Sequence, residues 1–278
     1  MRFDYVKPRD IVEISKAKKA GGTLFAGGTD VFVKIRNKVM NPHLLVDTKG
    51  VETGKIDFDG KFLTIYMNTT YRDLLKSEVV KKHFPLIFKI VKTVGSPQIR
   101  NRGTPVGNVG NASPAGDFLL SLYLYEASCV IAPTMREVKI SELVKGPGKL
   151  DLGEDEFIHA LKVPYLQGYE GYFEKVGARN AMVISIASIG VLMKRKKNVI
   201  EDVRIAFGSV APTILRSKEV EESVKGKMLS QDVFERIGEE YEKLSKPITD
   251  IRASADYRKK LVRNLPLKAY FNFKGEIP

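Results

Sequence analysis

The chain has 278 residues, 43% of them hydrophobic and 28% charged, which are the proportions of an ordinary globular protein long enough to bury one or two cores. Its one cysteine, Cys129, excludes a disulfide framework and a cysteine-ligated zinc or iron–sulfur site within the chain. No apolar run approaches the length of a membrane span and Met1–Tyr5 lacks a secretory core, so we expect a cytoplasmic protein that does not bind membranes.

The N-terminal 50 residues predict short strands that alternate with helices. A strand at 3–5 precedes a helix that starts near Pro8 and ends at Gly21-Gly22. An apolar strand at 23–26 leads into a helix at 31–38, and a further strand follows at 44–46.

A glycine-centred segment, Ala26-Gly27-Gly28-Thr29-Asp30, lies at this strand-to-helix junction. Glycine allows positive φ and close approach of the backbone to a ligand, and successive free N–H groups form a concavity that binds anions. A tight turn with no ligand explains these five residues equally well.

The middle of the chain predicts a hairpin, two helices and a long irregular segment. Asp59-Gly60 is a strong turn signal between strands at 55–58 and 61–66. Helical spacing covers 71–83 and 84–94. Residues 96–116 have almost no periodicity and many turn formers, and such a segment in a compact domain is usually functional. We expect Asp117 to cap a buried helix at 118–125.

A second glycine-centred segment, Thr104-Pro105-Val106-Gly107-Asn108, lies inside this irregular region. The two segments together could clasp a diphosphate from both sides. The alternative is an irregular loop whose polar groups are satisfied by its own backbone.

A change of pattern between Pro164 and Gly168 predicts a domain boundary that separates 1–166 from 167–278. The second part predicts strands at 182–193 and 203–207, then helices at 218–224, 230–244 and 254–269, an α+β arrangement. The net charge of +13 is dispersed, and its one dense run, 194–197, reads as a solvated hairpin turn rather than a nucleic-acid surface.

Candidate catalytic groups are sparse. The three histidines, His43, His83 and His159, lie far apart without metal-ligand spacing, and Cys129 sits in an apolar strand. Neither a Walker loop nor a Gly-x-Gly-x-x-Gly fingerprint occurs. The sequence thus has two candidate phosphate-binding segments but no recognisable catalytic acid, base or nucleophile. This combination favours a protein in which a bound cofactor carries out the chemistry.

Four segments, 26–30, 94–104, 108–117 and 207–213, together resemble the FAD-binding (medium) subunit of the molybdenum hydroxylases. This family includes the flavoprotein subunits of xanthine dehydrogenase and aerobic carbon monoxide dehydrogenase. The resemblance implies a vanillyl-alcohol-oxidase (PCMH)-type FAD-binding domain followed by a smaller α+β flavoprotein C-terminal domain.

The resemblance also implies bound FAD, which we expect to be noncovalent because neither glycine-centred segment has a histidine or cysteine beside it. The FAD contacts that it implies are Leu24, Phe25, Ala26, Gly27, Gly28, Thr29, Asp30, Val31, Thr104, Val106, Gly107, Asn108, Asp117, Leu161 and Lys175. Relatives commonly carry Ile-Gly-Gly-Asn where this chain has Pro105-Val106-Gly107-Asn108. Pro105 has no N–H and Val106 resists positive φ, so we expect a phosphate donor or a glycine-only conformation to be missing and FAD to bind more weakly.

The resemblance therefore implies an electron-transfer flavoprotein subunit. Electrons from a molybdenum cofactor on a large subunit would pass through [2Fe–2S] clusters on a small subunit to FAD, and then to NAD or another acceptor. A FAD-free scaffold subunit of the same complex and a stand-alone FAD oxidase are the alternatives.

Overall fold

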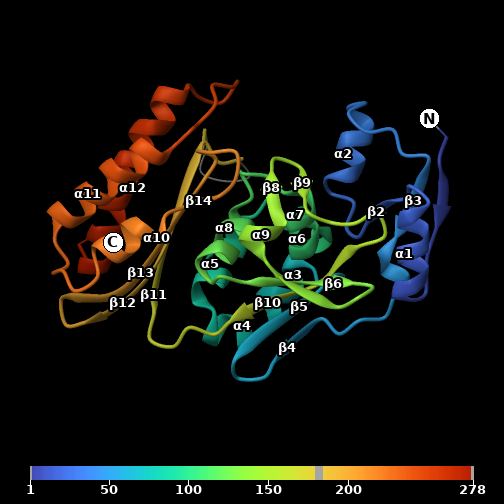
Figure 1. Cartoon of the computed structure of the whole chain (residues 1–278), viewed down its shortest axis with the longest axis horizontal. Helices are drawn as coiled ribbons and strands as arrows, with labels where there is room; N and C mark the ends of the chain where they lie inside the picture. Colours follow the sequence, from blue (N-terminus) through green and yellow to red (C-terminus); the bar gives the residue numbers. More distant parts are fainter. Residues whose placement is uncertain (1, 179–183, 277–278) are drawn as a thin grey trace. The chain divides into compact units, whose positions relative to one another are not determined.

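The computed structural model describes residues 2–178 and 184–276 (Figure 1). The chain forms two compact units. The first unit comprises Met1–Phe84, Val94–Ala112 and Glu126–Tyr165, and the second comprises Pro85–Thr93, Ser113–Tyr125 and Leu166–Pro278. These units are not the ranges 1–166 and 167–278, which stay a prediction about domain organisation.

The first unit contains three sheets. A parallel sheet has the order β1-β3-β2, with β1 (Asp4–Val6), β2 (Thr23–Phe25) and β3 (Leu44–Asp47). An antiparallel sheet has the order β4-β5-β10-β6-β7, with β4 (Ile56–Phe58), β5 (Phe62–Tyr66), β6 (Ser128–Ala132), β7 (Arg136–Lys139) and β10 (Phe157–Pro164). A small pair consists of β8 (Val144–Gly146) and β9 (Lys149–Leu150).

Short helices connect these strands. They are α1 (Ile11–Lys19), α2 (Val31–Arg36), the 3-10 helix η1 (Thr48–Gly50), α3 (Tyr71–Lys76), α4 (Glu78–His83), α6 (Pro97–Arg102), α7 (Pro105–Asn111) and α9 (Ile140–Leu143). The predicted alternation of strand and helix up to β3 is confirmed, because α1 and α2 are the crossovers that parallel strands require. The predicted hairpin is also confirmed, with Asp59 Oδ1 accepting from Lys61 N at 2.8 Å in its turn.

The expectation of an irregular segment at 96–116 is wrong, because α6 and α7 occupy much of it. Ser96 caps α6 and Thr104 caps α7, and each helix has proline at its first position, where the absent N–H costs nothing. Helices of six and seven residues are too short for a periodic pattern to show in the sequence.

The second unit is a four-stranded antiparallel sheet with the order β11-β12-β13-β14. Its strands are β11 (Glu170–Val176), β12 (Ala187–Lys196), β13 (Val199–Gly208) and β14 (Leu215–Arg216). Its helices are α5 (Pro85–Thr93), α8 (Asp117–Leu124), α10 (Lys218–Ser223), α11 (Gln231–Leu244) and α12 (Ala255–Lys274). The predicted helices are present, while Met182 and Val183, predicted to begin a strand, lie outside the described residues.

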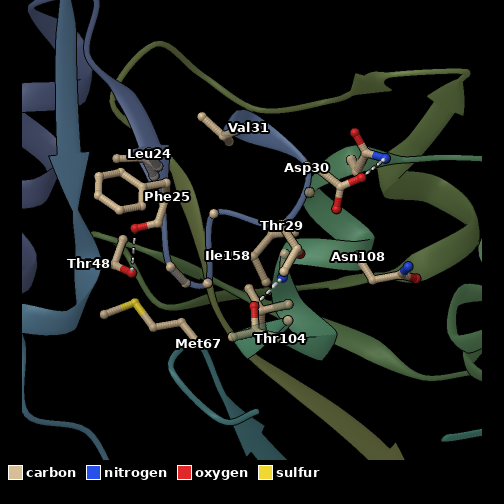
Figure 2. A pocket seen from close by; sticks show the side chains of 18 of the residues that line it. Leu24, Phe25, Thr29, Asp30, Val31, Thr48, Met67, Thr104, Asn108 and Ile158 are labelled. Carbon is tan, nitrogen blue, oxygen red and sulfur yellow. Dashed lines mark hydrogen bonds between the residues drawn. The ribbon is translucent and has the colours of Figure 1, made fainter. Parts of the chain in front are cut away.

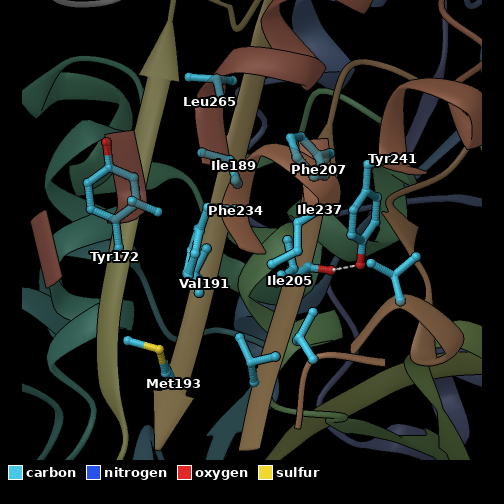
Figure 3. Packing of buried hydrophobic residues seen from close by; sticks show 14 of the residues in the cluster. Tyr172, Ile189, Val191, Met193, Ile205, Phe207, Phe234, Ile237, Tyr241 and Leu265 are labelled. Carbon is cyan, nitrogen blue, oxygen red and sulfur yellow. Dashed lines mark hydrogen bonds between the residues drawn. The ribbon is translucent and has the colours of Figure 1, made fainter. Parts of the chain in front are cut away.

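Helices cover both faces of this sheet. Its main apolar core lies between the strands and α11–α12, where Ile189, Val191, Ile205 and Phe207 meet Phe234 (Figure 3). Helix α8 packs against the sheet at Gly190, where a Cβ would approach Leu120 to 2.5 Å. The basic run at 194–197 lies where β12 turns into β13, as predicted.

Asp117 is the first residue of α8 and Gly116 is its N-cap, so the expected capping role of Asp117 is wrong. All eight residues of α8 are buried, as its apolar sequence predicted. Within the described ranges, every helix is too short or too polar to cross a lipid bilayer.

Candidate functional site

A pocket of about 400 Å³ lies within the first unit, and residues of both glycine-centred segments line it (Figure 2). Its volume is within the range of small-molecule sites. The predicted FAD contacts that line it are Leu24, Phe25, Ala26, Gly27, Gly28, Thr29, Asp30, Val31, Thr104, Val106, Gly107 and Asn108. The structure thus brings together two segments that are far apart in the sequence.

The first segment needs both of its glycines for conformational reasons. A Cβ on Gly27 would lie 1.9 Å from the Arg102 carbonyl oxygen, so the loop packs directly on the end of α6. Gly28 has φ +74°, a conformation that L side chains rarely adopt. Gly27 thus lets the first segment pack against Arg102, two residues before the second segment begins.

This loop also presents unused donors. In the described part of the chain, the backbone amides of Gly27, Gly28 and Thr29 donate to no protein acceptor. Buried and half-buried amides normally have partners, and a run of free amides is a concavity suited to an anion. The loop therefore has the donors that a phosphate group requires.

The second segment is the first turn of α7. Thr104 Oγ1 accepts from Gly107 N at 2.9 Å, and Pro105 takes the first helical position. Val106 is 8% exposed and helical, with negative φ, so valine fits the backbone of this turn without strain. Pro105 supplies no N–H, and the missing phosphate donor and the weaker FAD binding stay predictions.

Asn108 provides a direct test of whether the pocket fits a polar ligand. Its side-chain oxygen Oδ1 is buried and has no hydrogen-bond partner, although Asn108 lines the pocket. Two residues later in α7, Gly110 also lines the pocket, and a Cβ built on it meets no atom within 4 Å. A buried, unsatisfied acceptor on a pocket-lining residue is a group that a ligand donor would complete.

The charged side chains of the pocket are Lys18, Lys34 and Asp30. Loss of solvent around the Asp30 carboxyl raises its pKa, while the charge of Lys34 acts in the opposite direction. Figure 2 shows Asp30 and Asn108 on the same side of the pocket. Lys34 and the free amides of the first segment give the pocket donors that suit an anionic ligand.

The remaining wall is apolar and was not predicted. It includes Met40, Met67, Leu150, Leu152, Phe157 and Ile158. The loop before β10 is fixed by Arg136, which binds Glu156 through two hydrogen bonds of 2.6 and 2.7 Å. Nothing in the local sequence marks these residues, because only the tertiary fold brings them to the pocket.

Three predicted FAD contacts do not line this pocket. Asp117 and Lys175 lie in the second unit, where Lys175 Nζ is 2.6 Å from Asp117 Oδ2 and Ser185 Oγ donates to Asp117 Oδ1 at 2.6 Å. Leu161 is fully buried in β10. Contacts of these three residues with FAD stay predictions.

No histidine or cysteine is among the described residues that line the pocket. Cys129 is buried in β6, where burial raises the pKa of its thiol to about 12. Nor do three His, Cys, Asp or Glu side chains of the described residues gather as metal ligands. The pocket offers donors, one acceptor and an apolar wall, which bind and orient a ligand.

Comparison with known proteins gives a consistent result along the whole chain. Residues 1–166 match the family model of the FAD binding domain in molybdopterin dehydrogenase, and residues 172–272 match the CO dehydrogenase flavoprotein C-terminal domain. The glyceraldehyde dehydrogenase medium chain of Sulfolobus acidocaldarius is 31% identical over 273 residues, covering 96% of this chain and 97% of that protein.

Carbon monoxide dehydrogenase of Hydrogenophaga pseudoflava is similar in sequence and in structure. Its medium chain is 28% identical over 264 residues, covering 92% of each chain. A crystal structure of that enzyme lacking the Mo-pyranopterin moiety contains a chain with a TM-score of 0.92 and 26% identity, with 96% of both chains covered. This chain therefore belongs to the molybdenum hydroxylase family as its FAD-binding flavoprotein subunit, the α+β oxidoreductase component that the sequence resemblance implied.

Proposed function

We propose that the pocket of the first unit binds FAD noncovalently and that the chain relays electrons through it. The observation that carries this proposal is the pairing of free amides at Gly27–Thr29 with the unsatisfied Asn108 oxygen in one pocket. The amides suit the diphosphate, and Asn108 Oδ1 suits a hydroxyl or amino donor of the nucleotide.

The roles of the protein residues are binding and orientation. The apolar wall of Met67, Leu152 and Ile158 excludes water and packs against an aromatic ring system. The absence of a histidine or cysteine among the described lining residues supports noncovalent attachment. When bound, FAD exchanges electrons singly or in pairs, which suits a junction between one-electron and two-electron carriers.

We further propose that the partners are a molybdenum-cofactor large subunit and a [2Fe–2S] small subunit, with NAD or another molecule as the final acceptor. The names of the similar proteins support this, since they are medium chains or FAD-binding subunits of dehydrogenases. The single cysteine of this chain requires the iron–sulfur clusters to be on another subunit.

The first experiment is a flavin assay on the purified full chain. We expect a flavin absorbance spectrum and complete release of FAD into the supernatant after acid precipitation. Flavin left on the polypeptide would contradict noncovalent binding. A chain that binds no added FAD, alone or in its complex, would instead favour the FAD-free scaffold.

The second experiment tests the relay. In the assembled complex, the substrate of the large subunit should bleach the flavin absorbance, and removal of the small subunit should abolish this bleaching. Bleaching by a substrate without any partner would favour the stand-alone oxidase.

A further inference from the structure

Among the described residues, Lys34 is a pocket cation that makes no direct ion pair, although its charge acts on the Asp30 carboxyl one helical turn earlier. It belongs to α2 and lines the pocket. Its ammonium Nζ makes one hydrogen bond, of 2.5 Å, to the neutral side-chain oxygen of Asn111. Among the described residues, no carboxylate lies within ion-pair distance of Lys34. A lysine ammonium has three donors, so two remain available.

Lys18, the other lysine of the pocket, makes more contacts within the protein. Its Nζ donates to the carbonyl oxygens of Gly153 at 3.0 Å and Glu154 at 2.9 Å. It also feels the charges of three carboxylates in the same loop, at residues 154–156. The ammonium of Lys18 therefore mainly stabilises the loop at 153–156.

The ammonium of Lys34 lies beside the C-terminal end of α7. Lys34 follows Asp30 by one helical turn, so its side chain lies on the face of α2 nearest the end of the first segment. Its partner Asn111 is the last residue of α7, the helix that the second segment begins. Lys34 thus links α2 to α7 at the edge of the pocket.

We propose that Lys34 binds the diphosphate of the cofactor through its ammonium group, acting together with the free amides of the first segment. This inference rests on the proposed function, because it takes the pocket as the FAD site. A lysine acts on phosphate as a compact point charge, and its flexible stem lets the ammonium reach a phosphate oxygen. It also adds a donor to a pocket in which Pro105 has no N–H to offer.

The role predicts selectivity among ligands by their charge. FAD and ADP carry the diphosphate, whereas adenosine shares the nucleoside and lacks the phosphates. Lys34 should therefore contribute to the binding of FAD and ADP and contribute nothing to adenosine.

The test is a titration of the flavin-free full chain with FAD, ADP and adenosine. A charge-assisted hydrogen bond predicts at least a tenfold loss of FAD and ADP affinity in Lys34→Met, with adenosine affinity unchanged. Lys34→Arg keeps the charge and should retain most of the affinity. Lys19→Met, which removes a charge from an exposed position of α1 outside the pocket lining, is the matched control.

Salt dependence gives a second readout. Because salt screens charges, FAD affinity of the native chain should fall as ionic strength rises, and Lys34→Met should show a smaller fall. Unchanged FAD affinity in Lys34→Met, or an equal loss for adenosine, would overturn the assignment. If the native chain binds neither FAD nor ADP, the proposed function itself is wrong, and so is the role of Lys34. If the native chain binds both and only the expected loss in Lys34→Met is missing, the role of Lys34 alone is wrong.

Discussion

Two helices of this chain begin beside an aspartate that follows a glycine-rich segment, and their surroundings are opposite. Helix α2 follows Gly28 and Asp30, and none of its six residues is buried. Helix α8 follows Gly116 and begins with Asp117, and all eight of its residues are buried. The Asp30 side chain makes no capping hydrogen bond, whereas Asp117 is paired with Lys175.

The difference shows that a local sequence signature does not decide between a ligand site and a packed core. The apolar residues of α2 are half-buried or exposed, with Phe32 packing edge-on against Phe25, and the helix borders a pocket. Those of α8 fill the space against a four-stranded sheet. In the second unit, Gly116 and Asp117 therefore belong to a packed helix, whereas in the first unit Gly28 and Asp30 line a pocket.

The largest expected effect comes from breaking the buried pair of the second unit. Asp117→Ala leaves the Lys175 ammonium, 13% exposed, without its partner, which should lower the free energy of unfolding by about 3–5 kcal/mol. Asp30→Ala should change it by less than about 0.5 kcal/mol, since Asp30 makes no capping bond. Urea denaturation of both variants checks this, and equal losses would remove the contrast between the two aspartates.

A change at Val106 tests whether the second segment needs a glycine for its ligand. Val106→Gly should destabilise the chain by about 2–3 kcal/mol, because it removes a buried side chain and places glycine in α7. We expect no gain in FAD affinity, because Val106 already has helical φ. Tighter FAD binding in a direct titration would show that the valine obstructs the cofactor.

Filling the open space at Gly110 tests the pocket itself. Gly110→Leu should lower FAD affinity at least tenfold, a loss of about 1.4 kcal/mol or more, because the new side chain enters the pocket. Gly110→Ala adds one methyl group and should reduce affinity less, while circular dichroism should show both variants folded. Full affinity in the leucine variant would place the cofactor away from α7.

The smallest effect concerns the loop that closes the apolar wall. The Arg136 guanidinium lowers the pKa of Glu156 from 4.5 to about 2, so this carboxylate is more acidic in the folded state. Its stabilising contribution is complete above about pH 4.5 and is lost as pH falls towards 2. Glu156→Gln should flatten the stability profile in that interval by no more than about 1 kcal/mol, since Arg136 is exposed. An unaltered profile would mean that the pair contributes nothing there.

The sequence predicted the elements that local signals determine. Asp59-Gly60 specified a turn, and the apolar run at 118–125 specified a buried helix. It did not reveal α6 and α7, although Ser96-Pro97 and Thr104-Pro105 are start signals, because each helix is too short for periodicity to confirm it.

The candidate site was predictable only where glycine and small polar residues cluster. That composition identified the two segments around Gly28 and Gly107 that meet in the pocket. It could not identify Ile158 or Leu152, which reach the pocket from another sheet and its loop, nor the link from Lys34 to Asn111. Such contacts depend on long-range packing, which a local pattern does not encode.

The lack of burial in α2 has a consequence for local opening. A helix without a buried residue can unfold alone at little cost, whereas α8 cannot leave its sheet without disrupting the second unit. Amide hydrogens of α2 should therefore exchange with deuterium quickly, and those of α8 only through global unfolding. A ligand that engages Lys34 and the loop before it would slow exchange at α2 selectively, so this helix would report cofactor loading before any electron moves.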